Sequence, residues 1–223
     1  MGDPLWYHLP VDFAGIDWSW IGVNVAVLLF SLSVHESAHA WSADRLGDPT
    51  ARMQGRVTLN PIVHLDWFGS LLFPFFGFLV GGILFGWAKP VPVNTANLSR
   101  PKTDHVWIAA AGPASNIAAA VLFFLILKLF LPAGSGGEGV LSILWLVCAV
   151  GVFLNVVLAV FNLLPIPPLD GGWILEGLLP DSFSSWFDAI RPYGFIILVG
   201  LLYLGFIGAV LQPVLHFVRR MIF

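Results

Sequence analysis

Long apolar stretches, separated by short polar and turn-rich segments, dominate the sequence. A helix needs about 20 apolar residues to cross the hydrocarbon core of a bilayer. Four stretches meet this requirement, and they predict transmembrane helices at about residues 19–43, 105–131, 140–164 and 192–218. We therefore expect an all-α integral membrane protein, a polytopic helical bundle with one domain over residues 1–223.

A further apolar stretch, residues 67–87, is long enough to cross the bilayer but contains Pro74 and five glycines. Such residues break helices, and broken backbone at membrane depth persists only where protein buries it or where it lines a wet cavity. We predict a membrane-embedded re-entrant or hairpin segment between the first two core spans. The segment that follows, residues 89–93, alternates as a strand does, and its prolines favour an exposed edge in an extended or hairpin element.

The composition indicates a surface that faces lipid. Hydrophobic residues make up 58% of the chain and charged residues only 10%, with a mean hydropathy of +0.87, whereas soluble domains carry about 25% charged residues. The lipid bilayer is therefore an expected partner. The net charge of −3 excludes nucleic acid, because no basic patch can neutralise phosphates. The single cysteine, Cys148, excludes disulfide scaffolds and cysteine-based metal sites.

The distribution of lysine and arginine orients the chain. Basic residues gather between the first two predicted spans and again at Arg191, ahead of the fourth, while the segment up to Trp18 has none. Only Arg219 and Arg220 disagree with this asymmetry. By the positive-inside rule, we expect the N-terminus outside and the polar segments after the first and third spans in the cytoplasm.

The strongest motif, His35-Glu36-Ser37-Ala38-His39, lies inside the first predicted span. Positions i and i+4 of a helix share one face, so both imidazoles can reach one zinc ion, and the glutamate beside them can take a proton from activated water. The pattern also arises by chance in soluble proteins. Inside a span, however, each ionisable side chain costs roughly 2.5–3.5 kcal/mol on insertion scales, so three of them together favour a function.

A catalytic zinc site needs a third protein ligand and leaves its fourth position open. The extended metzincin pattern is absent, because Ser42 and Arg45 occupy its glycine and histidine positions. Asp170 has the most favourable context, because prolines end the third span before it and two glycines follow it. A plain helix stop with an interfacial Asp is the alternative interpretation. The remaining candidates for the third ligand are Asp44, His64, Asp66 and Glu176.

Three motifs, in this order along the chain, resemble those of the site-2 proteases, which are intramembrane zinc metalloproteases. They are the histidine motif at 35–39, the segment Ala111-Gly112-Pro113-Ala114-Ser115-Asn116, and the run from Asn162 through Pro165 to Leu169-Asp170-Gly171. Residues 55–61 and 86–94 are similar to those of a small bacterial and archaeal subgroup. We expect neither a PDZ nor a CBS domain.

The resemblance implies one zinc ion per chain, held by His35, His39 and Asp170, with Glu36 as the base. It also implies that Asn162 helps to hold the scissile carbonyl, for which a helix-terminal hydrogen bond is the alternative. The expected activity is hydrolysis of peptide bonds in or near transmembrane helices, as in regulated intramembrane proteolysis. The expected partners are transmembrane protein substrates, and the expected place is a prokaryotic cell membrane, with the active site open to the cytoplasm.

The rival interpretation is a metal-binding membrane protein without hydrolysis, such as a transporter or sensor, which needs ligands but no base at Glu36. Asn116 either donates a hydrogen bond into the site or makes an interhelical bond to backbone. We expect His64 and Asp66 to form a structural cap rather than a second metal site. His8, His105 and His216 are expected to be interfacial bystanders, and the small residues around Gly112 to let helices pack closely. The pattern does not indicate an oligomeric state.

Overall fold

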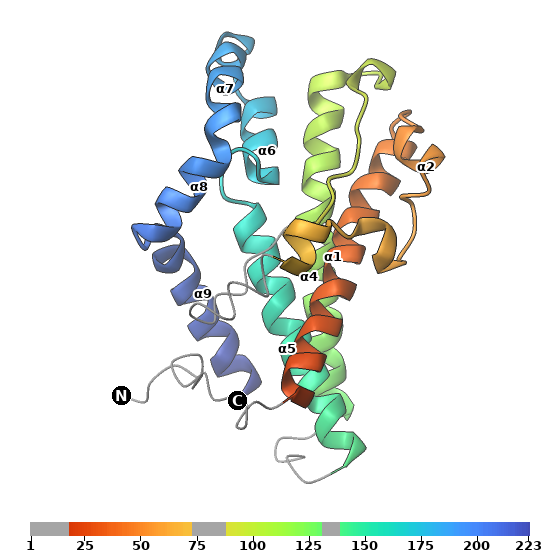
Figure 1. Ribbon diagram of the computed structural model, residues 1–223, viewed down its shortest axis with the longest axis vertical. Coiled ribbons are helices and arrows are strands. Elements are labelled where there is room, and N and C mark those ends of the chain that lie inside the picture. The colour runs from red at the N-terminus through yellow and green to blue at the C-terminus, as the bar shows by residue number, and fades with distance from the viewer. Residues whose placement is uncertain (1–17, 73–87, 131–138) are drawn as a thin grey trace.

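The computed structural model describes residues 18–72, 88–130 and 139–223, and this part of the chain is helical, with no strand (Figure 1). Its body is formed by three long helices, α1 (Trp18–Arg45), α4 (Pro101–Phe130) and α5 (Val140–Asn162). Helix α4 packs against both α1 and α5, so it lies at the centre of the bundle. The all-α class predicted from the apolar pattern is confirmed.

Within the described ranges, helical segments long and apolar enough to cross a membrane are Ser19–Arg45, Pro101–Phe130, Val140–Asn162 and Asp181–Tyr203. The first three coincide with predicted spans. The fourth starts and ends earlier than the predicted range 192–218. It is assembled from four consecutive elements: η6 (Asp181–Phe183), α7 (Ser184–Ile190), η7 (Arg191–Tyr193) and α8 (Gly194–Tyr203).

The predicted continuous helix over 192–218 is divided at Gly205. This residue has φ +76° and separates α8 from α9 (Phe206–Ile222). Glycine adopts a left-handed φ without steric cost and so commonly ends a helix. The N–H of Leu204 donates to the carbonyl of Gly200, and that of Gly205 to the carbonyl of Leu202. Hydropathy continues unchanged through this turn, which is why the apolar pattern alone predicted one helix.

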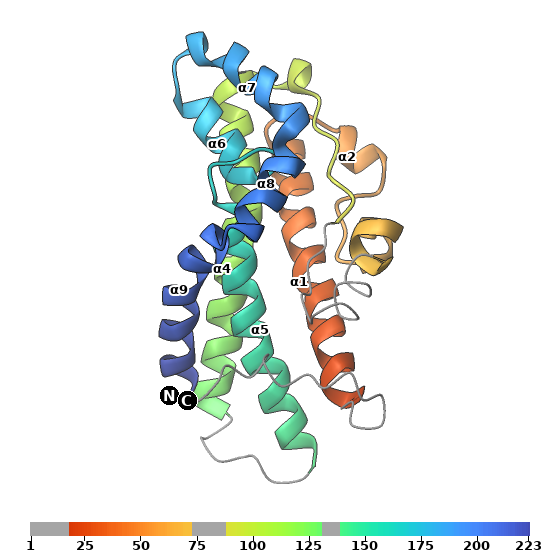
Figure 2. The same cartoon turned by 60° about the vertical axis from the view of Figure 1, so that its left-hand side comes forward.

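The two ends of the bundle differ (Figures 1 and 2). Helix α9 lies against α5 at the end where a buried apolar cluster joins α4, α5 and α9. The opposite end carries the short elements α2 (Thr50–Met53), η5 (Thr95–Asn97), α6 (Asp170–Leu178) and α7. Two further short elements, η3 (Pro61–His64) and η4 (Trp67–Leu72), flank α1. This second end therefore holds the polar connections.

An extended segment, residues 88–94, follows a course fixed by buried charged groups. Arg56 is 3% exposed and donates to the carbonyl oxygens of Val63 and Pro90, while the N–H of Lys89 donates to the carbonyl of His64 at 2.8 Å. The described part of the predicted extended element is extended but pairs with no strand. We call residues 88–94 the strap.

Asp48 fastens the far end of the strap. It is fully buried and accepts hydrogen bonds from the N–H of Asn94 at 2.7 Å, from Nδ2 of Asn97 at 2.8 Å and from the N–H of Thr50 at 3.1 Å. Burial acts to raise the pKa of this carboxyl, but the hydrogen bonds from Thr50, Asn97 and Asn94 outweigh it and lower the pKa. Asp48 is therefore ionised and bonded.

The predicted re-entrant segment over 67–87 is described only at its start, where residues 67–72 form the short π-helix η4. Residues 73–87 lie outside the described part of the chain. The re-entrant course therefore stays a prediction.

Candidate metal centre

Two histidines of α1 and the first residue of α6 converge inside the bundle. The Nε2 atoms of His35 and His39 are 3.0 Å apart. Nε2 of His35 lies 3.2 Å from Oδ2 of Asp170, and Nε2 of His39 lies 3.4 Å from Oδ1 of the same carboxylate. Both imidazoles are buried. Residues far apart in sequence therefore place three ligand atoms around one point.

This donor set fits a tetrahedral zinc ion. Zinc bonds of about 2.0–2.2 Å to nitrogen and oxygen place neighbouring ligand atoms roughly 3.3 Å apart, and the three observed separations, 3.0, 3.2 and 3.4 Å, are close to this value. Oδ2 of Asp170 is buried and has no hydrogen-bond partner among the described residues. A buried carboxylate oxygen in that state needs a cation, and zinc supplies one.

The second nitrogen of each imidazole is held by α4. Nδ1 of His39 lies 2.7 Å from the carbonyl oxygen of Ile108, and Nδ1 of His35 lies 2.6 Å from Oδ1 of Asn116. Both partners are acceptors, so each Nδ1 carries the proton and donates it. Each Nε2 therefore turns a lone pair towards Asp170, the tautomer that a metal ligand requires.

Asn116 belongs to a fully buried amide network that joins three helices. Its Nδ2 donates to Oδ1 of Asn155 at 2.8 Å and to the carbonyl of Ser31 at 3.3 Å. Nδ2 of Asn155 in turn donates to Oγ of Ser31 and to the carbonyl of Gly151, both at 2.8 Å. Both asparagines are 0% exposed. The network sets the register of α1, α4 and α5 around His35.

Neither expectation for Asn116 describes it completely. The expected interhelical bond to backbone exists, to the carbonyl of Ser31, but towards the site Asn116 accepts a hydrogen bond instead of donating one. Asn155 was missed in the sequence. The signal for it was an amide in the middle of an apolar span, which is costly there unless it is hydrogen-bonded.

Gly112 of α4 leaves the space that the two imidazoles occupy. A Cβ atom at this position would lie 2.3 Å from Nε2 of His39 and 2.7 Å from Cε1 of His35. Side chains packed this closely can relieve such an overlap only by moving away from the ligand geometry. The glycine does more than the predicted close packing of helices, because it makes room for the ligands themselves.

Asp170 is presented by a compact turn between α5 and α6. A Cβ atom on Gly171 would lie 2.3 Å from the carbonyl oxygens of Leu163 and Leu164, and one on Gly172 would lie 2.8 Å from the backbone nitrogen of Pro167. The two glycines therefore let α6 start directly against the preceding loop. The carboxylate heads α6, where the helix dipole favours negative charge.

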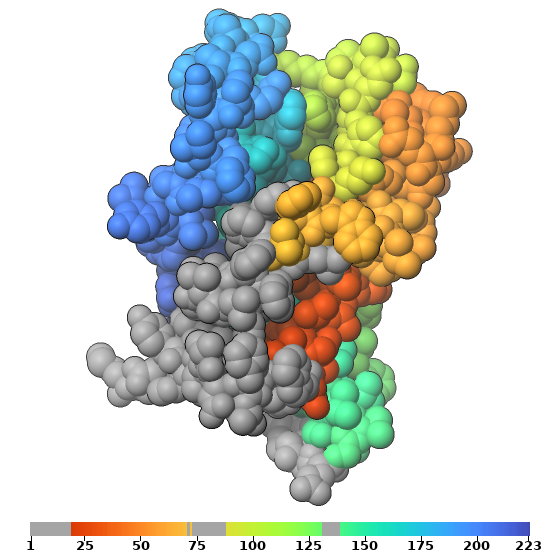
Figure 3. All heavy atoms as spheres, viewed as in Figure 1, coloured from red at the N-terminus to blue at the C-terminus, as the bar shows by residue number. Residues whose placement is uncertain are grey.

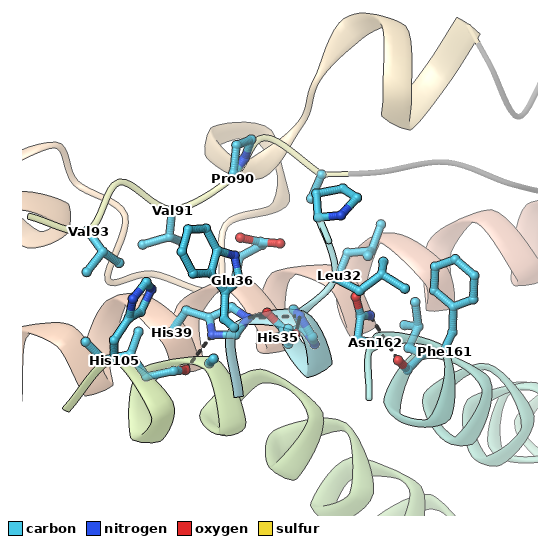
Figure 4. A pocket seen from close by; sticks show the side chains of 18 of the residues that line it. Leu32, His35, Glu36, His39, Pro90, Val91, Val93, His105, Phe161 and Asn162 are labelled. Carbon is cyan, nitrogen blue, oxygen red and sulfur yellow. Dashed lines mark hydrogen bonds and ion pairs between the residues drawn. The ribbon is translucent and has the colours of Figure 1, made fainter. Parts of the chain in front are cut away.

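A pocket of about 380 Å³ opens beside the three ligands and is lined from α1, α4, α5, α6, α8 and the strap. Figure 3 shows that the surface recedes between α8 and the strap. Glu36 and Asn162 both line this pocket (Figure 4). Nδ2 of Asn162 donates to the carbonyl of Leu158 at 2.9 Å, so one of its two N–H groups makes the helix-terminal bond.

The comparisons with known proteins agree with this geometry. The model of Peptidase family M50 matches residues 137–201, which contain Asn162 and Asp170. The "Putative zinc metalloprotease YwhC" of Bacillus subtilis is 41% identical over 199 residues, which cover 86% of this chain and 85% of the relative. This chain belongs to peptidase family M50. No solved structure matches it.

Two further relatives are each named "Putative zinc metalloprotease Rip2". The one from Mycolicibacterium smegmatis is 33% identical over 82% of this chain and 69% of its own length. The one from Mycobacterium tuberculosis is 34% identical over 86% of this chain and 69% of its own length. As an M50 peptidase the chain is a zinc metalloprotease of the site-2 type and an integral membrane protein, as the motifs predicted. Nothing in these comparisons favours a transporter or sensor.

The other candidates for the third ligand of this M50 peptidase have partners elsewhere. Asp44 pairs with Arg52, and Glu176 pairs with Arg191 at 2.7 Å. Asp66 accepts the N–H groups of the first turn of η4, as expected of a cap. Nε2 of His64 lies 2.8 Å from the carbonyl of Thr58.

Among the histidines expected to be bystanders, His216 is exposed on α9 and His8 lies outside the described residues. His105 does not fit that expectation, because it lines the pocket beside the ligands.

Proposed function

We propose that this M50 peptidase hydrolyses peptide bonds in or near transmembrane helices of other membrane proteins, with one zinc ion held by His35, His39 and Asp170. The observation that carries the proposal is the approach of the three ligand atoms to within 3.0–3.4 Å of one another. They meet inside a bundle whose helix α1 is long and apolar enough to cross a membrane. Such a site can act on chains that lie in the same bilayer.

Glu36 is the proposed general base. Its side chain is buried in the pocket wall beside His39 and is not one of the three gathered ligands (Figure 4). Zinc bound here supplies Lewis-acid chemistry, which polarises a peptide carbonyl and acidifies water. Glu36 then accepts a proton from the attacking water and returns it to the leaving amine. A transporter needs no such group.

Asn162 is proposed to hold the scissile carbonyl. Its amide has two N–H groups, and the bond to Leu158 uses one of them. The other can donate to the oxygen on which negative charge develops, an interaction worth about 3–4 kcal/mol in other enzymes. Asn162→Ala should then slow turnover steeply while the zinc content stays unchanged.

The substrate is proposed to bind as an extended strand. A helix hides its amides in its own i→i−4 hydrogen bonds, so a segment must unwind before hydrolysis. Pro90, Val91 and Val93 of the strap line the pocket, and the N–H of Val91 has no partner among the described residues. An extended substrate can therefore pair with the strap by strand addition. Gly or Pro in a substrate span should raise its cleavage, and a poly-Leu span should resist it.

Separating metal binding from chemistry tests the assignment. In purified protein, Glu36→Gln should retain about one zinc ion per chain and lose cleavage of a panel of single-span substrates. His39→Ala and Asp170→Ala should lose the metal as well. Proteolysis by Glu36→Gln at the wild-type rate would contradict the role of Glu36 as base. Full zinc content in Asp170→Ala would contradict the ligand set.

We further propose that the site opens to the cytoplasm of a prokaryotic cell. His39 lies less than two turns before Arg45. Near the same end of the bundle, Arg56 and Arg100 lie in the connections and Lys102 lies in the first turn of α4, as the positive-inside rule requires. For His39 and Asp170 to share a metal, the chain between them must cross the bilayer an even number of times. Since α4 and α5 supply two crossings, residues 67–87 must enter and leave on one side.

Labelling of single cysteines tests this topology. In a Cys148→Ser background, cysteines placed at exposed Met53 and at exposed Asn94 should both resist an impermeant reagent on intact cells and react once the membrane is opened. A cysteine at exposed Val140, the first residue of α5 at the other end of the bundle, is the control and should react on intact cells. Labelling at Asn94 alone from outside would contradict the even number of crossings.

A further inference from the structure

The face of α4 that supports the metal centre continues one turn further, to His105. Asn116, Gly112 and Ile108 recur every four residues, and each lies against a ligand histidine. His105 is three residues before Ile108 and therefore lies on the same face. It lines the pocket together with the ligands, and Figure 4 shows it next to His39. Between His105 and Asn116 it is the only titratable side chain of α4.

The imidazole of His105 is held by a stack of side chains from α6 and η7. Its ring centroid lies 4.6 Å from that of Trp173, at an interplanar angle of 40°. The guanidinium carbon of Arg191 lies 4.1 Å from the Trp173 ring centroid, and Arg191 pairs with Glu176 of the same helix α6 at 2.7 Å. Stacking and a cation–π contact thus set where the imidazole lies. The charged or titratable groups around His105 are Glu176, Arg191, His39 and Asp170.

An unwound substrate needs polar partners in this pocket. Each peptide unit that leaves a helix loses its hydrogen bond, and a backbone group without a partner costs several kcal/mol where water is scarce. The wall near His105 is mostly apolar, including Val91, Val93 and Ile108. The three ligands bind the metal and Glu36 takes the proton, so these side chains do not bind the substrate backbone. His105 and Asn162 are the remaining imidazole and amide of the lining, and Figure 4 places them on opposite sides of the ligand histidines.

We propose that His105 binds the backbone of the unwound substrate on the Val93 side of the scissile bond, opposite Asn162. A neutral imidazole has one donor and one acceptor nitrogen, so it can serve either a carbonyl or an N–H of the substrate. Trp173 and Arg191 are positioning residues that act through His105. This inference rests on the proposed function, because it uses the same pocket and the same extended substrate.

The test measures substrate binding and turnover separately. Full-length wild type and variants are reconstituted in lipid with one single-span substrate, and KM, kcat and zinc content are determined. His105→Ala should raise KM about tenfold, the effect of one lost net hydrogen bond, with kcat within about twofold and zinc retained. His105→Phe, which keeps a ring on Trp173 but no hydrogen-bonding group, should match it. His105→Gln should recover most of the affinity, and His216→Ala, at an exposed histidine, should equal wild type.

The positioning residues have their own expectation. Trp173→Leu should raise KM in the same direction, Trp173→Phe should raise it less, and Trp173→Leu should add little to His105→Ala, because both act through one contact. A wild-type KM in both His105→Ala and His105→Phe would overturn the inference, as would lost zinc or a lowered kcat at constant KM. If Glu36→Gln cleaves as wild type does, the proposed function fails and the inference with it. If Glu36→Gln is inactive while both His105 variants behave as wild type, the inference alone fails.

Discussion

Two regions of this peptidase bury polar groups, and they do so with different chemistry. Around the metal centre the supporting groups are neutral amides, Asn116 and Asn155, placed between long helices. At the strap they are ionised side chains, Asp48 and Arg56, bonded mainly to backbone groups. The helices satisfy their own backbone and need only side-chain contacts between them, at a depth where charge is costly. The strap has no regular backbone hydrogen bonds of its own, so charged side chains supply hydrogen-bond partners for its backbone groups.

From this comparison we predict that substitutions in the helical region lower zinc binding, whereas substitutions at the strap leave zinc binding unchanged. The largest effect is expected at Gly112. Gly112→Ala should lower zinc affinity by on the order of a hundredfold or more and abolish cleavage, because a Cβ would overlap both ligand imidazoles. Zinc analysis after dialysis against a weak chelator measures this. Gly200→Ala, where a Cβ meets nothing within 4 Å, is the control. Full zinc retention in Gly112→Ala would show that the ligands can move aside.

The amide network should produce the next largest effect. Asn116→Leu removes the acceptor that orients His35, so zinc affinity should fall about 10–100-fold. Asn155→Leu acts one bond further away and should lower thermal stability with a smaller loss of zinc. Chelator competition measures the zinc affinity of each variant, and thermal unfolding measures its stability. Equal zinc loss in both variants would mean that Asn155 orients His35 as directly as Asn116 does.

At the strap, Arg56 should affect cleavage without affecting the metal. Arg56→Met keeps much of the side-chain volume but leaves the carbonyl groups of Val63 and Pro90 without their donor, at a cost of about 1.5–3 kcal/mol. We expect cleavage to fall about tenfold with zinc unchanged. Arg52→Met, at an exposed arginine paired with Asp44, is the matched control. Loss of zinc in Arg56→Met would erase the distinction between the two regions.

The smallest effect concerns acid stability at Asp48. Its pKa is lowered in the folded state, so its stabilising contribution is complete above the unfolded value of about 3.9 and is lost as pH falls through the folded-state value. The difference in unfolding temperature between wild type and Asp48→Asn should therefore shrink as pH falls below about 4. Thermal unfolding across that range measures it. A difference independent of pH would mean that Asp48 acts by shape alone.

Local chemistry made most of the site predictable. His35 and His39 lie four residues apart on a helix, so their shared face follows from the helical period. Asp170 follows prolines and precedes glycines, so an irregular turn was expected there. Neither the role of Asn155 nor the division of the last apolar stretch at Gly205 was predicted. The role of Asn155 depends on the side chains that it contacts on α1 and α4, which the local sequence does not reveal. The division at Gly205 is hidden because the apolar pattern continues unchanged through it.

The sequence by itself determined the membrane class, the long helices and the residue types of a zinc peptidase, because hydropathy and helical spacing act over short distances along the chain. Only the tertiary structure decided which faces of those helices meet. It placed Gly112 against two imidazoles, and it carried His105 from an expected interfacial position into the pocket wall. Such contacts join α1, α4 and α6. No local periodicity encodes which helices pair, because the pairing depends on how all their side chains pack together.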